Sequence, residues 1–433
     1  MLGQIASDLT HFWNIPKRLV DFAIEVENAL ELQEKKIDNR AQRNFLKVLS
    51  GFRQAGVRES HLLPSHGYGY FDEGREVLDS LYASVFGGED ALVRHQLVSG
   101  THALRCALFG LLRPGDVVAM IPEIPYDTLH PLFGLSENAG SLCAWGVKAV
   151  GLSLAGLEEA KLQLPEKTKV VFIQRSKGYA WRDSISIERL ERIIRRIKSI
   201  RSDISVVVDN CYGEFVEEKE PCDVGADLAV GSLIKNPGGG MAPTGGYIVG
   251  KSEAVAKASV ALTAPGLGKE VGPTLGISRS FFVGLFLAPQ FVGEALKTSL
   301  FSARLFERLG YEVLPDFRHE RTDIIQAIQL GSREKVLAFA RGLQSAGPLE
   351  QRAVPEGAPM AGYTDEIVMA GGTFIQGGSL ELSCDAPLRS PYIVYLQGGL
   401  SSFHGKLGVL LAAREVEESR GAEKRSQPAR KEY

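Results

Sequence analysis

The feature that most constrains the fold is a series of short apolar segments that alternate with helix-like segments between residues 73 and 250. The apolar segments are 92–98, 117–121, 169–174, 204–209, 228–230 and 246–250, and the helix-like ones are 73–86, 101–112 and 187–200. Several of the apolar segments are continuous rather than alternating, which is typical of strands covered on both faces. The pattern predicts an α/β fold with a mostly parallel central sheet and helices on both of its faces.

The length and the change of pattern along the chain predict several regions. The chain has 433 residues, which allows two or three domains. We expect an N-terminal helical segment at 1–65, a large domain at 66–290, a small C-terminal α/β domain at 291–415 and a charged, frayed tail at 416–433. The small domain is predicted from strands at 311–314, 323–330, 366–370 and 392–396 around a helix at 334–344.

The composition excludes several classes of function. The formal net charge of −3 gives no electrostatic reason to expect nucleic acid or an anionic membrane as a partner. No apolar run is long enough to span a bilayer, and the N-terminus lacks the pattern of a secretory signal. The five cysteines show no CxxC pair and no metal-ligand spacing, so we expect neither a disulfide framework nor a metal site. These features predict a cytoplasmic protein.

The segment 229–240 carries the strongest chemical signal. It is an apolar run that leads through Ser232 to a single lysine, Lys235, and then to a glycine-rich turn. One interpretation is a strand followed by a loop with a solvated lysine, which is the commoner case in proteins. The other is a lysine in an apolar pocket, where burial favours the neutral, nucleophilic amine that forms Schiff bases.

Residues elsewhere in the chain favour the second interpretation. Pyridoxal phosphate needs an amine, an acidic partner for its ring nitrogen, a phosphate cradle and a group against the ring. Lys235 supplies the amine. Asp209 ends an apolar strand, where open α/β sheets place ligand-contacting residues, so it is the candidate acid. A strand-end aspartate that only caps a turn is the alternative.

A phosphate cradle is predicted where a strand ends and a helix begins. The residues are Ser99, Gly100, Thr101 and His102. Small residues let backbone N–H groups approach an anion, and a helix N-terminus favours negative charge. The Ser232 hydroxyl is a further candidate for the same phosphate. The alternative is a Ser/Thr helix cap with no ligand.

The remaining candidates would contact the ring or the substrate. Tyr126 is predicted to stack on the cofactor ring, and Gln174 to contact the cofactor from its strand end. Arg389 and Arg175 are the two candidates to bind a substrate carboxylate, which arginine holds with two parallel hydrogen bonds.

Taken together, these segments resemble the fold-type-I pyridoxal phosphate enzymes. Within that group the chain is similar to the methionine gamma-lyase-like proteins often labelled aluminium resistance proteins. The matching segments are 67–70, 74–75, 99–103, 112–116, 125–129, 173–176, 208–215, 235–239, 242–247 and 381–383, with Arg389 and 391–392. The resemblance extends from about residue 60 to about residue 410.

The resemblance implies an activity and an assembly. It implies a carbon–sulfur lyase, or a related enzyme of β- or γ-elimination, acting on an amino acid such as methionine, cysteine or cystathionine. It also implies a homodimer or homotetramer, in which Tyr68 and Tyr70 reach the neighbouring subunit's cofactor. The alternatives are an aminotransferase, a cysteine desulfurase using Cys384 in a C-terminal loop, or a cofactor-binding protein without turnover.

Overall fold

The chain folds into two compact units. The computed structural model describes residues 2–154 and 163–426. One unit is Arg40–Gln290, and the other combines Met1–Asn39 with Phe291–Tyr433. Two long helices, α3 (Glu31–Gln54) and α9 (Ser278–Arg308), cross the division between them. The first 39 residues thus group with the C-terminal part, whereas the sequence pattern placed residues 1–65 in a segment of their own.

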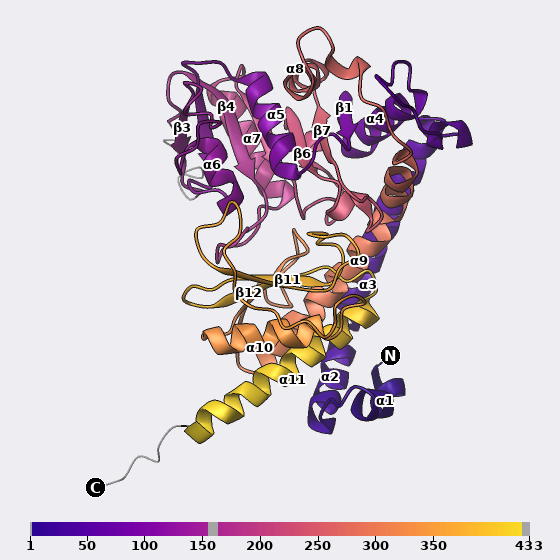
Figure 1. The fold of residues 1–433 in the computed structure, drawn as a ribbon, viewed down its shortest axis with the longest axis vertical. Coiled ribbons are helices and arrows are strands. Elements are labelled where there is room, and N and C mark those ends of the chain that lie inside the picture. Colours follow the sequence, from indigo (N-terminus) through magenta and orange to yellow (C-terminus); the bar gives the residue numbers. More distant parts are fainter. Residues whose placement is uncertain (1, 155–162, 427–433) are drawn as a thin grey trace. The chain divides into compact units, whose positions relative to one another are not determined.

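The unit Arg40–Gln290, called the large unit below, follows the expected alternation of strands and helices (Figure 1). Its strands are β1 (Asp90–Arg94), β2 (Val117–Ile121), β3 (Lys148–Gly151), β4 (Thr168–Gln174), β5 (Ser205–Asp209), β6 (Leu228–Ser232) and β7 (Gly246–Gly250). Its helices are α4 (Glu73–Phe86), α5 (Gly100–Leu111), α6 (His130–Phe133), α7 (Ile187–Ile200) and α8 (Ser252–Leu262). Short 3-10 helices occur at Glu59–Leu62, Asp127–Leu129, Pro221–Val224, Asn236–Gly238 and Gly268–Glu270.

The strands of this unit form one mixed, mostly parallel sheet. Its order is β1-β7-β6-β5-β4-β2-β3, and β7 runs antiparallel to both of its neighbours. The other four pairings are parallel. The predicted sheet is therefore confirmed, and the carboxyl ends of β2, β4, β5 and β6 lie along one edge.

Helices cover both faces of the sheet. Val170 and Phe172 of β4 pack in a core with residues of α5 and α8. The alternate residues Val171 and Ile173 pack in a second core with the apolar side of α7. Because successive side chains of a strand point to opposite faces, every position of β4 from 170 to 173 is buried. This explains the continuous apolar runs in the sequence.

Strand β1 differs from its predicted bounds. The sequence predicts a strand at 92–98, but β1 is Asp90–Arg94. Its neighbour β7 has five residues and pairs from Asp90 opposite Gly250 to Arg94 opposite Gly246, so pairing ends at Arg94. The apolar pattern alone did not reveal this limit.

The second unit contains an antiparallel sheet of order β10-β11-β12-β9-β8. The strands are β8 (Glu312–Leu314), β9 (Gln326–Gln329), β10 (Ile367–Ala370), β11 (Ser383–Pro387) and β12 (Ile393–Gln397). Its helices are the 3-10 helix Leu2–Ile5, α1 (Ala6–His11), α2 (Lys17–Ala29), α10 (Arg333–Gln344) and α11 (Ser402–Ser426). Helix α11 continues into the predicted frayed tail as far as Ser426, and the rest of that tail, 427–433, lies outside the described residues.

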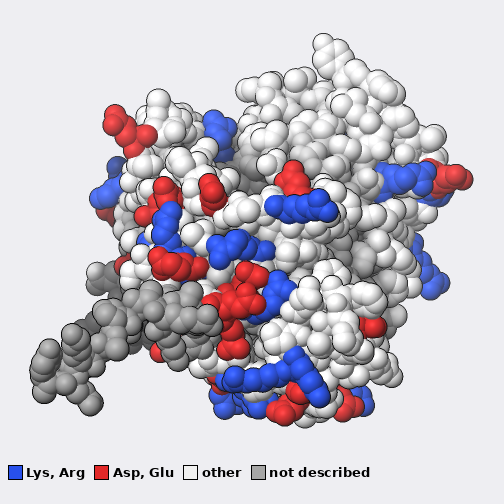
Figure 2. Space-filling model, turned by 60° about the horizontal axis from the view of Figure 1, so that its bottom comes forward, with Lys and Arg blue, Asp and Glu red and all other residues white. Residues whose placement is uncertain are grey.

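Several expected absences can be compared with the structure. Within residues 2–154 and 163–426, no helix is long and apolar enough to cross a membrane. The same part of the chain shows no group of three or more His, Cys, Asp or Glu residues able to hold a metal ion. All five cysteines are free thiols. On the face drawn in Figure 2, acidic and basic side chains lie next to one another.

A buried carboxyl group lies beside the sheet of the large unit. Glu214 has no exposed surface, and the Tyr247 hydroxyl of β7 donates a hydrogen bond of 2.8 Å to its Oε1. Burial raises the pKa of Glu214 to about 8, against the lowering effect of this hydrogen bond. The folded protein therefore holds a proton on Glu214 at a pH where an unfolded chain releases it.

This difference predicts how stability depends on pH. A carboxyl whose folded-state pKa is raised stabilises the fold fully below its unfolded pKa, and this contribution is lost as pH rises through the folded value. We expect Glu214→Gln, which stays neutral and keeps a hydrogen-bond acceptor, to gain stability relative to the wild type progressively as pH rises from about 5 to about 8, by roughly a few kcal/mol over this range. Urea unfolding across this range measures the effect. Parallel stability curves for the two proteins would contradict it.

Candidate active site

Polar residues meet at the carboxyl edge of the large unit's sheet. Gln174 at the end of β4 pairs with Asp209 at the end of β5, and Asp209 pairs with Val230 of β6. Ser232 ends β6 two residues further on. Three neighbouring strands thus deliver an amide, a carboxylate and a hydroxyl to one edge, which is where open α/β sheets bind ligands.

Asp209 is a buried carboxylate with a raised pKa. Its Oδ1 accepts a hydrogen bond of 3.1 Å from the Cys211 N–H. Burial raises the pKa of Asp209 to about 6, although the hydrogen bonds from Cys211 and the charge of Lys235 act in the opposite direction. A positively charged group beside this carboxylate would favour its ionised form.

Lys235 lies between β6 and a tight glycine turn. The Lys235 N–H donates to the Ser232 carbonyl at 3.3 Å, and the 3-10 helix Asn236–Gly238 follows at once. Gly238 is required here, because a Cβ at this position would lie 1.7 Å from the Leu233 carbonyl oxygen. The side chain of Lys235 is half-buried, and its Nζ lies 4.9 Å from the centroid of the Tyr212 ring. The lysine is therefore in an aromatic environment rather than a fully apolar one.

The predicted phosphate cradle lies close to Ser232 and Cys211. Ser99 caps α5, and its Oγ accepts the His102 N–H at 3.1 Å, so the alternative reading as a helix cap is correct for its side chain. Gly100 begins the helix, and a Cβ there would lie 3.3 Å from the Ser232 Cβ and 3.5 Å from the Cys211 Sγ. The helix N-terminus, with Thr101 in its first turn, thus faces the Ser232 end of β6. Such an N-terminus suits an anion.

His102 is neutral in this setting. Its Nδ1 accepts the Val98 N–H at 3.3 Å, and burial together with Arg105 lowers the pKa of its imidazole. The ring thus closes the turn before α5 and adds no fixed positive charge to the cradle.

Gln174 orients the loop that carries Tyr126. Its Oε1 accepts the Tyr126 N–H at 2.6 Å, and its Nε2 donates to the Ser176 carbonyl at 3.1 Å. The ring of Tyr126 packs edge-on against Tyr179, with the ring centroids 5.0 Å apart. Gln174 therefore acts on the position of Tyr126, a connection that the sequence did not indicate.

The two candidate arginines have different environments. Arg175 is fully buried, and its guanidinium donates to the Ile185 carbonyl, to Asn210 Oδ1, to the Gly213 carbonyl and to the carboxylate of Glu217. Its N–H donors are thus directed at other residues of the large unit. Arg389 belongs to the other unit, where it forms an ion pair of 2.6 Å with Asp365 and is 41% exposed.

Tyr68 and Tyr70 lie on an exposed loop before α4. Their side chains are 71% and 53% exposed, and their ring centroids are 5.5 Å apart. A single chain leaves both rings largely open to solvent. They are therefore not buried with Asp209 in the site of their own chain.

Two residues of the site were missed by sequence reasoning. The Cys211 N–H donates to Asp209, the Cys211 Sγ lies where a Cβ on Gly100 would meet it at 3.5 Å, and the Tyr212 ring lies beside the Lys235 amine. They lie two and three positions after Asp209 in the chain, so their closeness to it was a usable signal. Tyr212 has φ of 71°, in the left-handed region that non-glycine residues seldom adopt, and no sequence pattern predicted this turn.

The residues of the large unit fit pyridoxal phosphate. A lysine amine, a buried carboxylate and a helix N-terminus with a close-packed glycine are the groups that this cofactor requires. The contact between Gly100 and Ser232 joins the cradle to the strand that leads to Lys235. The residues that could hold the cofactor are thus Ser99, Gly100, Thr101, Tyr126, Asp209, Ser232 and Lys235.

Comparison with known proteins gives relatives of nearly full length. The family model for methionine gamma-lyase matches residues 19–417. The uncharacterised protein YnbB of Bacillus subtilis is 48% identical over 397 residues, which are 90% of this chain and 94% of that protein. Methionine gamma-lyase family members are pyridoxal phosphate-dependent, so the cofactor is implied by family.

Two solved structures show the same architecture. One, from Clostridium acetobutylicum, is proposed to be a cystathionine beta-lyase involved in aluminium resistance; it has a TM-score of 0.91 and 45% identity, covering 96% of this chain and 100% of that one. The other is a carbon-sulfur lyase involved in aluminium resistance from Clostridium novyi, with a TM-score of 0.89 and 44% identity, covering 95% and 98%. The predicted fold-type-I architecture is confirmed. The chain belongs to the methionine gamma-lyase family.

Proposed function

We propose that this protein is a pyridoxal phosphate-dependent carbon–sulfur lyase, or a related β- or γ-elimination enzyme, acting on an amino acid such as methionine, cysteine or cystathionine. The observation that carries the proposal is the assembly of Lys235, Asp209 and the close approach of the Gly100 backbone to Ser232 at one sheet edge. When bound, the cofactor supplies an electron sink conjugated to the substrate amine. The five free cysteines fit a reducing cytoplasm as the proposed location.

The binding residues have distinct roles in this proposal. The carboxylate of Asp209 would keep the ring nitrogen protonated, and the N-terminus of α5 with the Ser232 hydroxyl would hold the phosphate. The ring of Tyr126, whose loop is set by Gln174, would lie against the cofactor and exclude water from one side.

Lys235 would move the protons of the reaction. Elimination at the β or γ carbon needs a proton taken from the substrate Cα, and the neutral Nζ of Lys235 is the proposed base. For γ-elimination the resulting ammonium would first have to give up the Cα proton, and the neutral amine would then take a second proton from Cβ. The ring of Tyr212, 4.9 Å from Nζ, would stabilise the resulting ammonium by a cation–π interaction.

Arg389 is the proposed ligand of the substrate carboxylate. The guanidinium of Arg175 already donates to two backbone carbonyls, of Ile185 and Gly213. It also donates to Asn210 Oδ1 and to the Glu217 carboxylate. The exposed ion pair of Arg389 with Asp365 can exchange one carboxylate for another at small cost. A bidentate contact would orient the amino acid.

The desulfurase alternative loses its candidate nucleophile. Cys384 lies in strand β11 rather than in a loop, and it has no exposed surface because β10 and β12 pair on either side of it. Burial raises the pKa of its thiol well above the usual range. A thiol held in a sheet cannot swing to a substrate as a desulfurase requires.

The decisive experiment is a product assay. The holoprotein is incubated with methionine, cysteine, cystathionine and a panel of other amino acids, while keto acid, ammonia and sulfide or thiol are measured. A lyase releases all three products from one substrate. Keto acid that appears only with an acceptor keto acid would identify an aminotransferase, and no product from any substrate would favour a binding protein without turnover.

The first prediction concerns Lys235. We expect apoprotein titrated with pyridoxal phosphate to gain a visible absorption band. Lys235→Ala should lack this band, because Lys235 is the proposed amine that bonds the cofactor. Borohydride reduction followed by mass spectrometry should locate the cofactor on Lys235. The matched control is Lys251→Ala, which removes an exposed lysine paired with Asp227 and should keep the band. A wild type without the band would contradict the proposal.

The second prediction concerns Asp209. We expect Asp209→Asn to keep some cofactor, because the amide can still accept the Cys211 N–H, but to lose roughly a hundredfold or more in turnover. The reason is that a neutral amide cannot hold the ring nitrogen protonated. Asp203→Asn, an exposed aspartate before the same strand, is the control. Unchanged turnover in Asp209→Asn would reduce Asp209 to a capping role.

The third prediction concerns assembly as a homodimer or homotetramer with shared sites. Tyr70→Ala and Lys235→Ala chains are each expected to be inactive alone. If Tyr70 acts in the partner's site, each mixed dimer has one intact site, so random pairing of equal amounts should restore roughly a quarter of all sites. Subunit exchange is verified with a mass-tagged chain. No recovery after demonstrated exchange would place Tyr70 in the site of its own subunit.

A further inference from the structure

An exposed aromatic loop precedes helix α4. Besides Tyr68 and Tyr70, Phe71 is 93% exposed and lies 6.5 Å from the Tyr70 ring, centroid to centroid. The hydrophobic effect favours packing three exposed aromatic rings within four residues against the surface of the chain itself. Something in the structure must therefore hold the loop outward.

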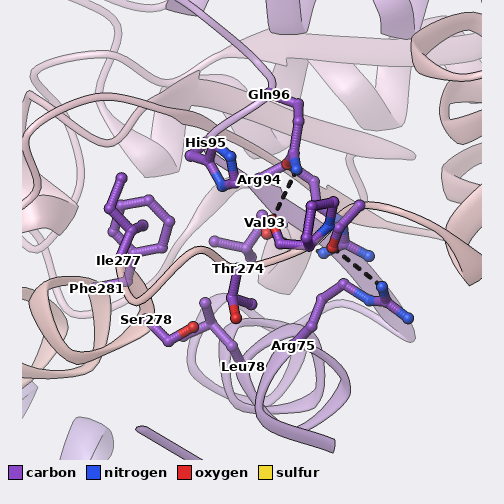
Figure 3. Close-up of a pocket in the computed structure, with 12 residues that line it drawn as sticks. Arg75, Leu78, Val93, Arg94, His95, Gln96, Thr274, Ile277, Ser278 and Phe281 are labelled. Atoms are coloured by element: carbon purple, nitrogen blue, oxygen red, sulfur yellow. Dashed lines mark hydrogen bonds between the residues drawn. The ribbon is translucent and has the colours of Figure 1, made fainter. Parts of the chain in front are cut away.

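One buried arginine binds the backbone of this loop. Arg75, in the first turn of α4, is 2% exposed, and its Nη1 donates to the Gly69 carbonyl at 2.7 Å. The same nitrogen donates to the Gly272 carbonyl at 3.1 Å (Figure 3), and Nη2 donates to the Glu270 carbonyl at 3.4 Å. One guanidinium thus joins the aromatic loop to the segment 270–274.

The loop is also packed closely against that segment. Gly69 has φ of 64°, and a Cβ there would lie 2.8 Å from both N and Cα of Pro273. The Gly272 N–H donates to the Tyr68 carbonyl at 3.0 Å. Ser65 and Thr274 exchange two further hydrogen bonds, of 3.0 and 2.9 Å, from backbone N–H to hydroxyl. The loop is therefore fixed at several points along its backbone while its rings remain exposed.

The hydrogen-bond acceptors of the Arg75 guanidinium are backbone carbonyl oxygens. Glu76 lies 3.9 Å away, and burial together with Arg94 lowers the pKa of the guanidinium, although the charges of Asp72, Asp79 and Glu76 act in the opposite direction. The guanidinium acts through its hydrogen bonds, because an apolar side chain would leave the carbonyl oxygens it bonds unpaired. What an apolar side chain cannot do is hold three carbonyls of two segments in one geometry.

We propose that Arg75 is a positioning residue of the active site: it holds the aromatic loop in the geometry in which Tyr68 and Tyr70 complete the site of a second copy of this chain. This inference rests on the proposed function, in which Tyr70 acts across the subunit interface. Arg75 itself touches neither cofactor nor substrate and acts through the loop backbone.

The first test measures cofactor binding as well as turnover. Arg75→Lys keeps a positive charge but loses the planar fork, so we expect the dissociation constant for pyridoxal phosphate to rise roughly tenfold and kcat/KM to fall roughly a hundredfold, as for a small displacement of a contacting group. Gly69→Ala displaces the same loop without altering Arg75 and should give the same pattern. Wild-type cofactor affinity and turnover in a folded Arg75→Lys protein would overturn the proposal.

A matched control separates positioning from general stability. Arg321 is another buried arginine, in the other unit, whose Nη2 donates to the Ser299 carbonyl at 3.1 Å. We expect Arg321→Lys to lower the melting temperature by about as much as Arg75→Lys while leaving cofactor affinity unchanged. An equal loss of cofactor affinity in both variants would show that Arg75 acts only through stability, and would overturn the proposal.

The second test asks in which subunit Arg75 acts. Arg75→Lys chains are mixed with Lys235→Ala chains, and roughly a quarter of all sites should recover, because each mixed dimer combines one intact lysine with one intact loop. If Tyr70→Ala chains recover with Lys235→Ala but Arg75→Lys chains do not, the positioning role is overturned and the shared site stands. If neither pair recovers after demonstrated exchange, the shared site fails and the inference fails with it.

Discussion

The structure of the large unit depends on the burial of its sheet from both sides. Helices α5 and α8 cover one face and α7 covers the other, so the strand interiors must be apolar at nearly every position. Polar side chains are then excluded from the strands and can gather only where the strands end. Gln174, Asp209 and Ser232 occupy three such ends. The chemistry of the site is thus confined to one edge by the same burial that stabilises the fold.

Most elements of the large unit could be predicted because their signals are local. Helices α4 and α7 and strands β2 and β7 have the predicted bounds, since each coincides with one apolar or helical run.

Strand β11 of the other unit could not be predicted: its Ser383-Cys384-Asp385-Ala386-Pro387 sequence lacks the β-branched and aromatic residues that favour strands. It is a strand because β10 and β12 supply hydrogen-bond partners on both sides. The sequence of one segment alone does not reveal which other strands will pair with it.

The residue types of the site were predictable, but the direction of their side chains was not. Gln174 is the last residue of β4 and Arg175 follows it, and their side chains take different directions. The amide of Gln174 reaches the Tyr126 loop, whereas the guanidinium of Arg175 turns to Asn210 and the Gly213 carbonyl. Sequence alone made both of them candidates to contact ligands. The partners that the two side chains reach decide between an orienting role for Gln174 and a structural role for Arg175.

Asp209 and Glu214 are two interacting buried carboxyl groups of the large unit, and their surroundings affect their ionisation differently. Burial raises the pKa of both, to about 6 for Asp209 and to about 8 for Glu214. Asp209 differs because the Cys211 hydrogen bonds and the charge of Lys235 favour its ionised form, whereas repulsion from Asp209 and Glu220 further disfavours ionisation of Glu214. The proton is therefore held more firmly on Glu214 than on the carboxylate at the strand end. A cationic ring nitrogen would lower the pKa of Asp209 further and, through the same repulsion, hold the proton on Glu214 more firmly.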